Sequence, residues 1–136
     1  MTPEDAWALL VSQRVLVLAT NTPGGPPHLV PITFAPLGPY RVVTAVDDKP
    51  KRTRRLQRLE NILRDGRVSL LAHDYTEDWS RLWWVRADGT ASVTDAPPAG
   101  AEPALRDRYP QYAGQVLGPW IVVEAEAVSG WAAGHP

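Results

Sequence analysis

Short segments that favour strands, separated by proline and glycine turns, are the feature that most constrains how this sequence folds. Fourteen prolines and ten glycines occur in 136 residues, and most of the prolines lie in turn-like clusters such as residues 22–27. The segments between these clusters are rich in valine, leucine and aromatic residues, which favour β-strands. This alternation of strand-favouring segments with proline and glycine turns predicts a mainly β protein. Strands joined by short turns are typical of a small barrel or sandwich.

The expected strands cover most of the chain. They lie at residues 14–21, 28–35, 40–46, 67–75 and 120–131, with a strand or hairpin over 82–93 that turns at Asp88-Gly89. The first three are joined by short turns, so we expect them to form an antiparallel meander. Pro31 cannot donate a ladder hydrogen bond, which indicates an edge, a bulge or a ligand contact at Pro31, Ile32 and Thr33.

Three helices are predicted. The first covers residues 3–12, because Thr2 can cap it and Pro3 suits its first turn. The second covers residues 51–64 and carries the leucines 56, 59 and 63, with Ile62, on its apolar face. The third covers residues 102–109 and ends before Pro110.

Positive charge is concentrated in one segment. Eight basic residues and two acidic ones lie between residues 49 and 67, although the whole chain has a net charge of −1. Clustered cations attract anions, and cations beside a helix N-terminus suit a phosphate group. The hydroxyl of Thr44, just ahead of this run, could serve the same ligand. A solvated basic face or a nucleic-acid contact is an equally open interpretation from composition alone, although no aromatic side chains interleave the run for base stacking.

Composition excludes several classes of chemistry. The chain has no cysteine, so thiol nucleophiles, disulfides and thiolate metal sites are excluded. His28, His73 and His135 lie far apart in the sequence and match no metal-ligand spacing, so we expect no metal site. We expect a single domain over residues 1–136, without a membrane span or a signal peptide, in the cytoplasm.

A set of motifs spans nearly the whole chain and identifies a family resemblance. The motifs are LAT at 18–20, PHLVPITF at 27–34, KPKRTRRLQRLENI at 49–62, RVSLL at 67–71, DWSRLWWVRADG at 78–89 and YPQY at 109–112. In their order and spacing they resemble the pyridoxamine 5′-phosphate oxidase-like split-barrel family, and within it the actinobacterial flavin- and deazaflavin-dependent oxidoreductases.

The resemblance implies a six-stranded antiparallel split β-barrel that forms a homodimer with two cofactor sites at the subunit interface. In similar proteins, basic residues after the third strand hold the cofactor phosphate. Here they correspond to Lys49, Lys51, Arg52, Arg55 and Arg58. The resemblance also implies that Thr33 and Thr44 contact the cofactor and that Trp79 lies near the site, in the same subunit or in its partner.

The narrower resemblance is to members that use the deazaflavin coenzyme F420. It implies an oxidoreductase that transfers a hydride between reduced F420 and a small organic electrophile, with no residue acting as a nucleophile. Three alternatives stay open at this point. They are an FMN-dependent enzyme of the same fold, a non-catalytic protein that binds a cofactor or a tetrapyrrole, and a nucleic-acid-binding protein, which the sequence favours least.

Overall fold

The computed structural model describes residues 1–47 and 56–134. Seven antiparallel strands form one sheet in the order β2-β1-β5-β6-β7-β4-β3. The strands are β1 (Leu16–Thr20), β2 (His28–Ile32), β3 (Ala35–Pro36), β4 (Arg41–Ala45), β5 (Arg67–Asp74), β6 (Trp83–Thr94) and β7 (Trp120–Ala132). The helices are α1 (Pro3–Val11), α2 (Gln57–Arg64) and α3 (Ala101–Arg108), with 3-10 turns η1 (Trp79–Arg81) and η2 (Pro110–Tyr112).

The sheet curls until its two edges meet. Strands β2 and β3 stand at opposite ends of the sheet order, yet only Thr33 and Phe34 separate them in the chain. Because the three Cα–Cα steps from Ile32 to Ala35 span at most about 11 Å, this link holds the edges together where no ladder of the described strands joins them. We call Thr33 and Phe34, with the adjoining ends of β2 and β3, the seam. The expected split barrel is confirmed, and the short β3 raises the strand count from six to seven.

The expected meander of the first three strands is wrong. Strand β2 pairs only with β1 among the described strands, whereas β4 pairs with β3 and with the last strand, β7. The seam is the reason, because the chain passes there from one edge of the sheet to the other. The edge position expected for Pro31 is confirmed, since β2 is an edge strand.

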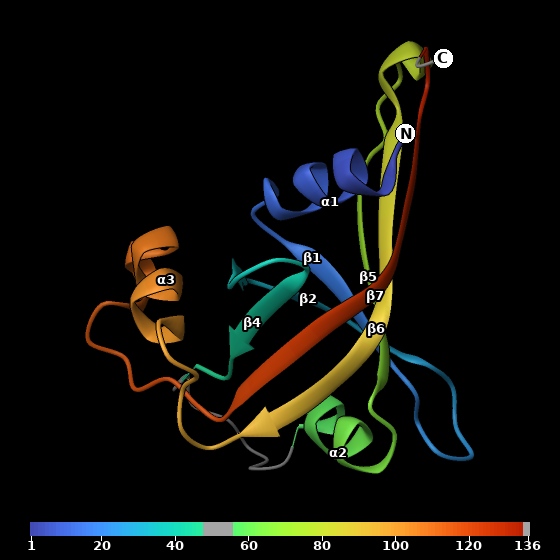
Figure 1. The fold of residues 1–136 in the computed structure, drawn as a ribbon. Helices are drawn as coiled ribbons and strands as arrows, with labels where there is room; N and C mark the ends of the chain where they lie inside the picture. The colour runs from blue at the N-terminus through green and yellow to red at the C-terminus, as the bar shows by residue number, and fades with distance from the viewer. Residues whose placement is uncertain (48–55, 135–136) are drawn as a thin grey trace.

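The sequence predicted either one strand or a hairpin that turns at Asp88-Gly89. In the structure, strand β6 runs through these two residues without a turn. It pairs with β5 on one side and β7 on the other, and its register shifts at Asp88/Gly89, which is a β-bulge. A Cβ atom at position 89 would collide with the carbonyl oxygen of Glu124 on β7. Glycine is therefore required here for close approach of two strands and not for a turn. The long β6 and β7 curve through the whole molecule (Figure 1).

Two groups of buried apolar residues fill the interior. The larger includes Leu10 of α1 with Leu18, Leu70 and Val85 of the sheet, so α1 closes one side of the curled sheet. The smaller joins α3 and η2 to β3, β4 and the start of β7, around the fully buried Trp120. Figure 1 shows α3 set apart from the main sheet, where it covers this second group.

The helices begin and end close to their predicted limits, with one exception. The Thr2 hydroxyl accepts a hydrogen bond from the Asp5 N–H, which confirms the predicted cap of α1. Helix α2 begins at Gln57, after an extended Leu56 with a ψ of 139°, and residues 51–55 of the predicted helix lie outside the described residues. The predicted apolar face of this helix is also partly wrong, since Leu63 is 72% exposed and Asn61 is fully buried instead. Among the described helices, none has the length and hydrophobicity needed to cross a membrane.

Candidate functional site at the seam

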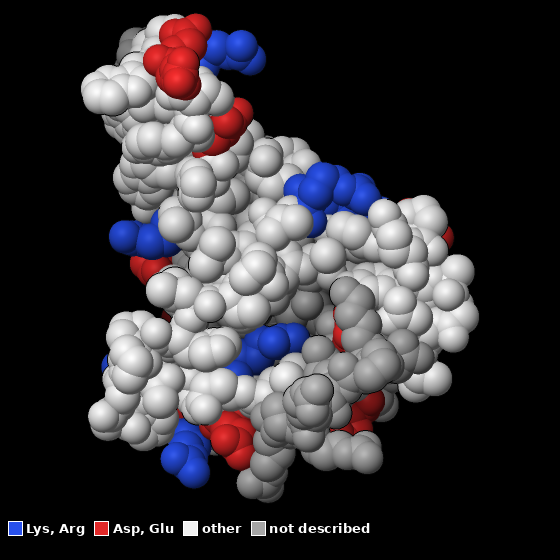
Figure 2. Space-filling model, turned by 180° about the vertical axis from the view of Figure 1, so that it is seen from behind, with Lys and Arg blue, Asp and Glu red and all other residues white. Residues whose placement is uncertain are grey.

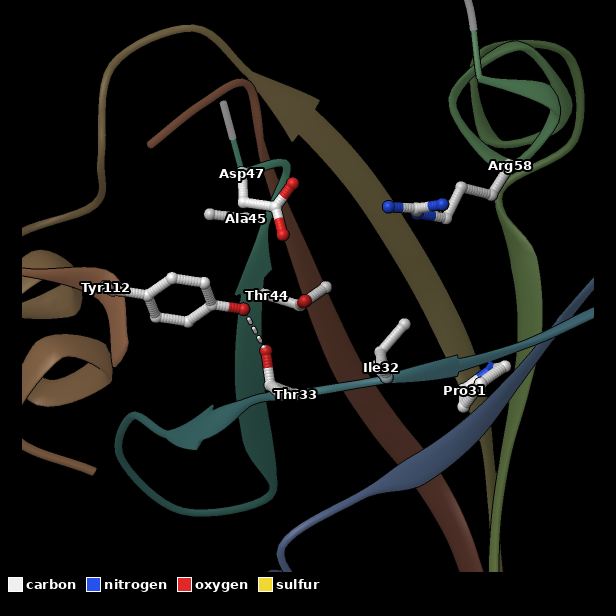
Figure 3. A pocket seen from close by; sticks show the side chains of 8 residues that line it. All are labelled: Pro31, Ile32, Thr33, Thr44, Ala45, Asp47, Arg58 and Tyr112. Atoms are coloured by element: carbon white, nitrogen blue, oxygen red, sulfur yellow. Dashed lines mark hydrogen bonds between the residues drawn. The ribbon is translucent and has the colours of Figure 1, made fainter. Parts of the chain in front are cut away.

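A polar pocket lies where the seam faces α2. It has a volume of about 190 Å³ and is lined by Pro31, Ile32, Thr33, Thr44, Ala45, Asp47, Arg58 and Tyr112. These residues come from the ends of β2 and β4, from the seam, from α2 and from η2 (Figure 3). From the side opposite to that of Figure 1, the surface is hollowed near its centre, and Lys or Arg atoms lie in the hollow (Figure 2).

Three of the predicted site residues meet in this pocket. Thr33 belongs to the seam, Thr44 is 4% exposed on β4, and Arg58 extends from the first turn of α2. Figure 3 shows the Arg58 side chain pointing across the pocket toward β4. The structure thus brings together residues from three elements, while their role in holding a cofactor stays a prediction.

Arg58 is the only arginine or lysine that lines the pocket among the described residues. Its Nε is buried and has no hydrogen-bond partner in the described part of the chain. Burial lowers the pKa of its guanidinium, and the negative charge of Asp47 acts in the opposite direction. A guanidinium that stays charged with a buried, unsatisfied N–H is suited to an anionic or strongly polar oxygen acceptor.

The position of Arg58 depends on how α2 is attached to the sheet. The buried Asn61 amide donates to the hydroxyls of Thr20 (2.9 Å) and Thr22 (3.0 Å), and its oxygen accepts from Gln57 (2.8 Å). These bonds satisfy a polar side chain that would otherwise be costly to bury. They fix the first turn of α2, and therefore Arg58, relative to β1.

Tyr112 provides the opposite wall of the pocket, and Tyr109 supports the seam beside it; the sequence interpretation missed both tyrosines as site residues. The Tyr112 hydroxyl lies 2.5 Å from the Thr33 hydroxyl, and the Tyr109 hydroxyl accepts from the backbone N–H of Phe34. Both bonds therefore satisfy polar groups of the seam, where the strand ladders stop. The YPQY motif at 109–112 was recognised as a helix end, but no local spacing shows that it meets a strand more than 70 residues earlier. Asp47, which follows β4, was also missed.

Of the remaining predicted site residues, only Trp79 belongs to the described part of the chain, and it does not line this pocket. Lys49, Lys51, Arg52 and Arg55 lie outside the described residues. Trp79 lies in η1 and is 75% exposed. This turn lies beside the C-terminal end of the chain, at the top of Figure 1, whereas α2 is at the bottom.

The comparison with protein families agrees with this architecture. The family model described as pyridoxamine 5′-phosphate oxidase matches residues 2–132. The chain belongs to the pyridoxamine 5′-phosphate oxidase family. Its members share the split-barrel fold described above, so the family expected from the sequence is confirmed. No protein with curated annotation matches the chain.

Solved structures show the same fold at low sequence identity. A conserved hypothetical protein of Mycobacterium tuberculosis is 23% identical, with a TM-score of 0.74, and the match covers 97% of this chain and 85% of that one. A heme binding protein of Mycobacterium smegmatis is 21% identical, with a TM-score of 0.74, and covers 98% of this chain and 55% of that one. A FAD-binding protein of Mesorhizobium loti is 18% identical, with a TM-score of 0.68 over 96% and 92% of the two chains.

Proposed function

We propose that this family member is an F420-dependent oxidoreductase that transfers a hydride between the reduced deazaflavin and a small organic electrophile. The observation that carries the proposal is the buried Nε of Arg58, which has no hydrogen-bond partner among the described residues and belongs to a side chain that lines a pocket together with Thr33 and Thr44. This donor set fits the oxygen-rich parts of a flavin-like cofactor. The basic run at residues 49–55 precedes α2 in the chain and adds cations that suit an anionic coenzyme.

Each pocket residue has a defined task under this proposal. Arg58 would donate charge-assisted hydrogen bonds to a phosphate or ring oxygen of the cofactor. Thr33 and Thr44 would add neutral hydrogen bonds that orient it, and Pro31 would present a strand edge without an N–H. When bound, the deazaflavin supplies the hydride chemistry, so the chain itself needs no nucleophile. The protein contributes position and a polar pocket.

The proposal also includes a homodimer with cofactor sites at the subunit interface. The position and exposure of Trp79 support this arrangement, because an indole 75% exposed at the end of the molecule opposite to α2 is suited to contact another subunit. Under this proposal, Trp79 lies near the partner's pocket. Light scattering after size-exclusion chromatography should give the mass of a dimer, and Trp79→Ala should weaken both dimerisation and cofactor affinity.

A flavin nucleotide is the second candidate cofactor. Two of the structurally similar proteins are described as FAD-binding, from Mesorhizobium loti and Mycobacterium smegmatis. A flavin nucleotide carries phosphate groups that the same Arg58 could hold. Haem is the third candidate ligand, because another structurally similar protein is a heme binding protein.

Parallel titrations of the purified protein with F420, FMN, FAD and haem test the proposal. The chain contains six tryptophans, so quenching of their fluorescence reports binding. We expect F420 to bind most tightly, with a micromolar or lower Kd. Tight binding of a flavin or haem without binding of F420 would replace the proposal with the corresponding alternative, and binding of none would reject the assignment of the pocket as a cofactor site.

A further inference from the structure

Two arginines fasten the end of α3 to the end of α1. Arg108, the last residue of α3, donates to the carbonyl oxygens of Gln13 (2.6 Å) and Val11 (3.3 Å). Arg14 donates in return to the carbonyl oxygen of Arg108 (2.6 Å). The last carbonyls of a helix have no partner within the helix and favour a nearby cation, and the last turn of α1 has no basic residue of its own. Arg108 therefore supplies the cation that the sequence of α1 lacks.

The guanidinium of Arg108 also packs against aromatic rings. Its Cζ lies 4.7 Å from the centre of the Phe34 ring and 5.7 Å from that of the Tyr109 ring. The Cζ of Arg14 lies 4.7 Å from the centre of the same Tyr109 ring. A cation within about 6 Å of a ring centre is attracted by the ring face. Two guanidinium groups and two rings thus form one cluster, and Phe34 of this cluster belongs to the seam.

A tyrosine hydroxyl joins the cluster to the backbone of the seam. The Tyr109 hydroxyl donates to the carbonyl oxygen of Arg14 (2.7 Å) and accepts from the N–H of Phe34 (3.2 Å). Thr33 and Phe34 belong to none of the described strands, so the regular ladder bonds of the sheet do not fix them. The position of the seam therefore depends on contacts from this cluster.

The cluster ends at the wall of the seam pocket. Thr33, which precedes Phe34, lines the pocket, whereas Arg108 does not. The Tyr109 ring meets the Tyr112 ring edge-on at 6.0 Å, and the Tyr112 hydroxyl lies 2.5 Å from that of Thr33 (Figure 3). Arg108 thus acts on Thr33 through Phe34, and on Tyr112 through Tyr109.

We propose that Arg108 is a positioning residue for the cofactor pocket. It fastens the wall formed by Thr33 and Tyr112 to the C-terminal end of α1, so cofactor affinity depends on a residue that touches no ligand. The physical reason is that a binding site is only as precise as the side chains that support it. The inference rests on the proposed function, because the ligand whose affinity it controls is the proposed cofactor.

Two substitutions of Arg108 test this role by fluorescence titration with F420. Arg108→Met removes the charge, the carbonyl contacts and the planar group. Affinity should fall by about 2- to 30-fold, the range for residues that influence a site without contacting its ligand. Arg108→Lys keeps the charge but loses the planar group that packs on the rings, and it should also weaken binding by about twofold or more. Arg64→Met removes a charge from an exposed position on α2 and should bind like the unmodified protein.

A stability control separates positioning from general destabilisation. Leu70→Ala weakens the core at a fully buried position of β5, and it should retain F420 affinity at a temperature where every variant is folded. Proton–nitrogen NMR spectra of the ligand-free proteins supply a second measurement. In both Arg108 variants the amide signals of Thr33 and Tyr112 should shift, while that of Val85 in β6 should stay in place.

Each outcome of these measurements bears on the positioning role. Unchanged F420 affinity in a folded Arg108 variant, or an equal loss in Leu70→Ala, would overturn it. If the unmodified protein binds no F420, the proposed function fails and the amide signals decide the inference alone. Shifts at Thr33 and Tyr112 without a shift at Val85 would then uphold the positioning of the wall, and their absence would reject it.

Discussion

The wall formed by β5, β6 and β7 and the seam at Thr33-Phe34 are built on different principles. In the wall, long antiparallel ladders join the three strands, with one bulge at Asp88/Gly89, and alternate residues of β5 are buried. In the seam, the ladders stop, and the hydroxyls of Tyr112 in η2 and of Tyr109 just before it bond to polar groups of the chain. The wall therefore obtains its stability from repetitive pairing and apolar burial, while the seam depends on a few specific side-chain contacts.

The difference has a consequence for where a ligand can bind. Backbone groups in the wall are already paired, so they offer little to a ligand. At the seam, two threonines and an arginine whose guanidinium N–H has no hydrogen-bond partner among the described residues line a pocket. Substitutions in the wall should accordingly reduce stability, and substitutions at the seam should mainly reduce ligand affinity.

The largest expected effect is a loss of stability caused by a substitution in the wall. Leu70 is fully buried and pairs with Leu18 on one side and Ala87 on the other. Leu70→Ala should lower the free energy of unfolding by about 2–5 kcal/mol, because it leaves a cavity in the core. Urea denaturation measures the change. Leu29→Ala on the edge strand, where the side chain is 64% exposed, should change stability by about 0.5 kcal/mol or less.

The next largest effect is a loss of cofactor affinity when Arg58, the cation of the pocket, is replaced. Arg58→Met should weaken cofactor binding by roughly 10- to 100-fold, since a hydrogen bond to a charged group contributes about 1.5–3 kcal/mol. Fluorescence titration measures the affinity, and stability should change little. Arg64→Met, on the exposed side of the same helix, is the matched control and should bind like the unmodified protein. Equal losses in both variants would show that general charge, and not the pocket, controls binding.

A third substitution tests whether wall and seam are linked through α2. Asn61→Leu removes the hydrogen bonds to Thr20 and Thr22 and should lower the free energy of unfolding by about 1–3 kcal/mol. Because Arg58 lies one turn earlier, cofactor affinity should fall as well. Unchanged affinity in a destabilised Asn61→Leu protein would contradict the view that this amide positions Arg58.

The smallest effect is a slight loss of stability from a substitution at the surface, between α2 and β5. Hydrogen bonds from Arg67 and Asn21 hold the pKa of the Asp65 carboxyl well below its ordinary value of 3.8. A carboxyl with a depressed pKa in the folded state stabilises the fold above its unfolded pKa and loses this contribution as the pH falls below that value. Asp65→Asn should therefore slightly lower the urea midpoint at neutral pH. The difference from the unmodified protein should shrink as the pH falls from about 4 toward 2.

The strands and their turns could be predicted locally, but their partners could not. Residues 67–72 alternate in burial as their spacing indicates, and the edge strand that was one of the interpretations of Pro31 is found at β2. The alternation predicted for 120–131 is broken, since Trp120 and Ile121 are both buried and Glu126 and Ala127 are both exposed. The bulge at Gly89 resembled a turn in the sequence, because glycine after aspartate is typical of turns. The sequence could not show that the carbonyl oxygen of Glu124, on a distant strand, lies close to Gly89. Similarly, the leucine spacing of α2 indicated that Leu63 is buried, whereas the buried residue is Asn61, whose partners lie on and just after β1.

The candidate site also combines features that the sequence predicted with features that only the structure revealed. The sequence alone determined the family, the mainly β architecture and the clustering of cations before α2, because motifs, periodicity and charge are local properties of the chain. Only the tertiary structure decided that Thr33, Thr44 and Arg58 share one pocket and that Tyr112 forms its opposite wall. The physical reason is packing between distant parts of the chain, because η2 packs with β3 and β4 around Trp120 and so brings Tyr112 to Thr33.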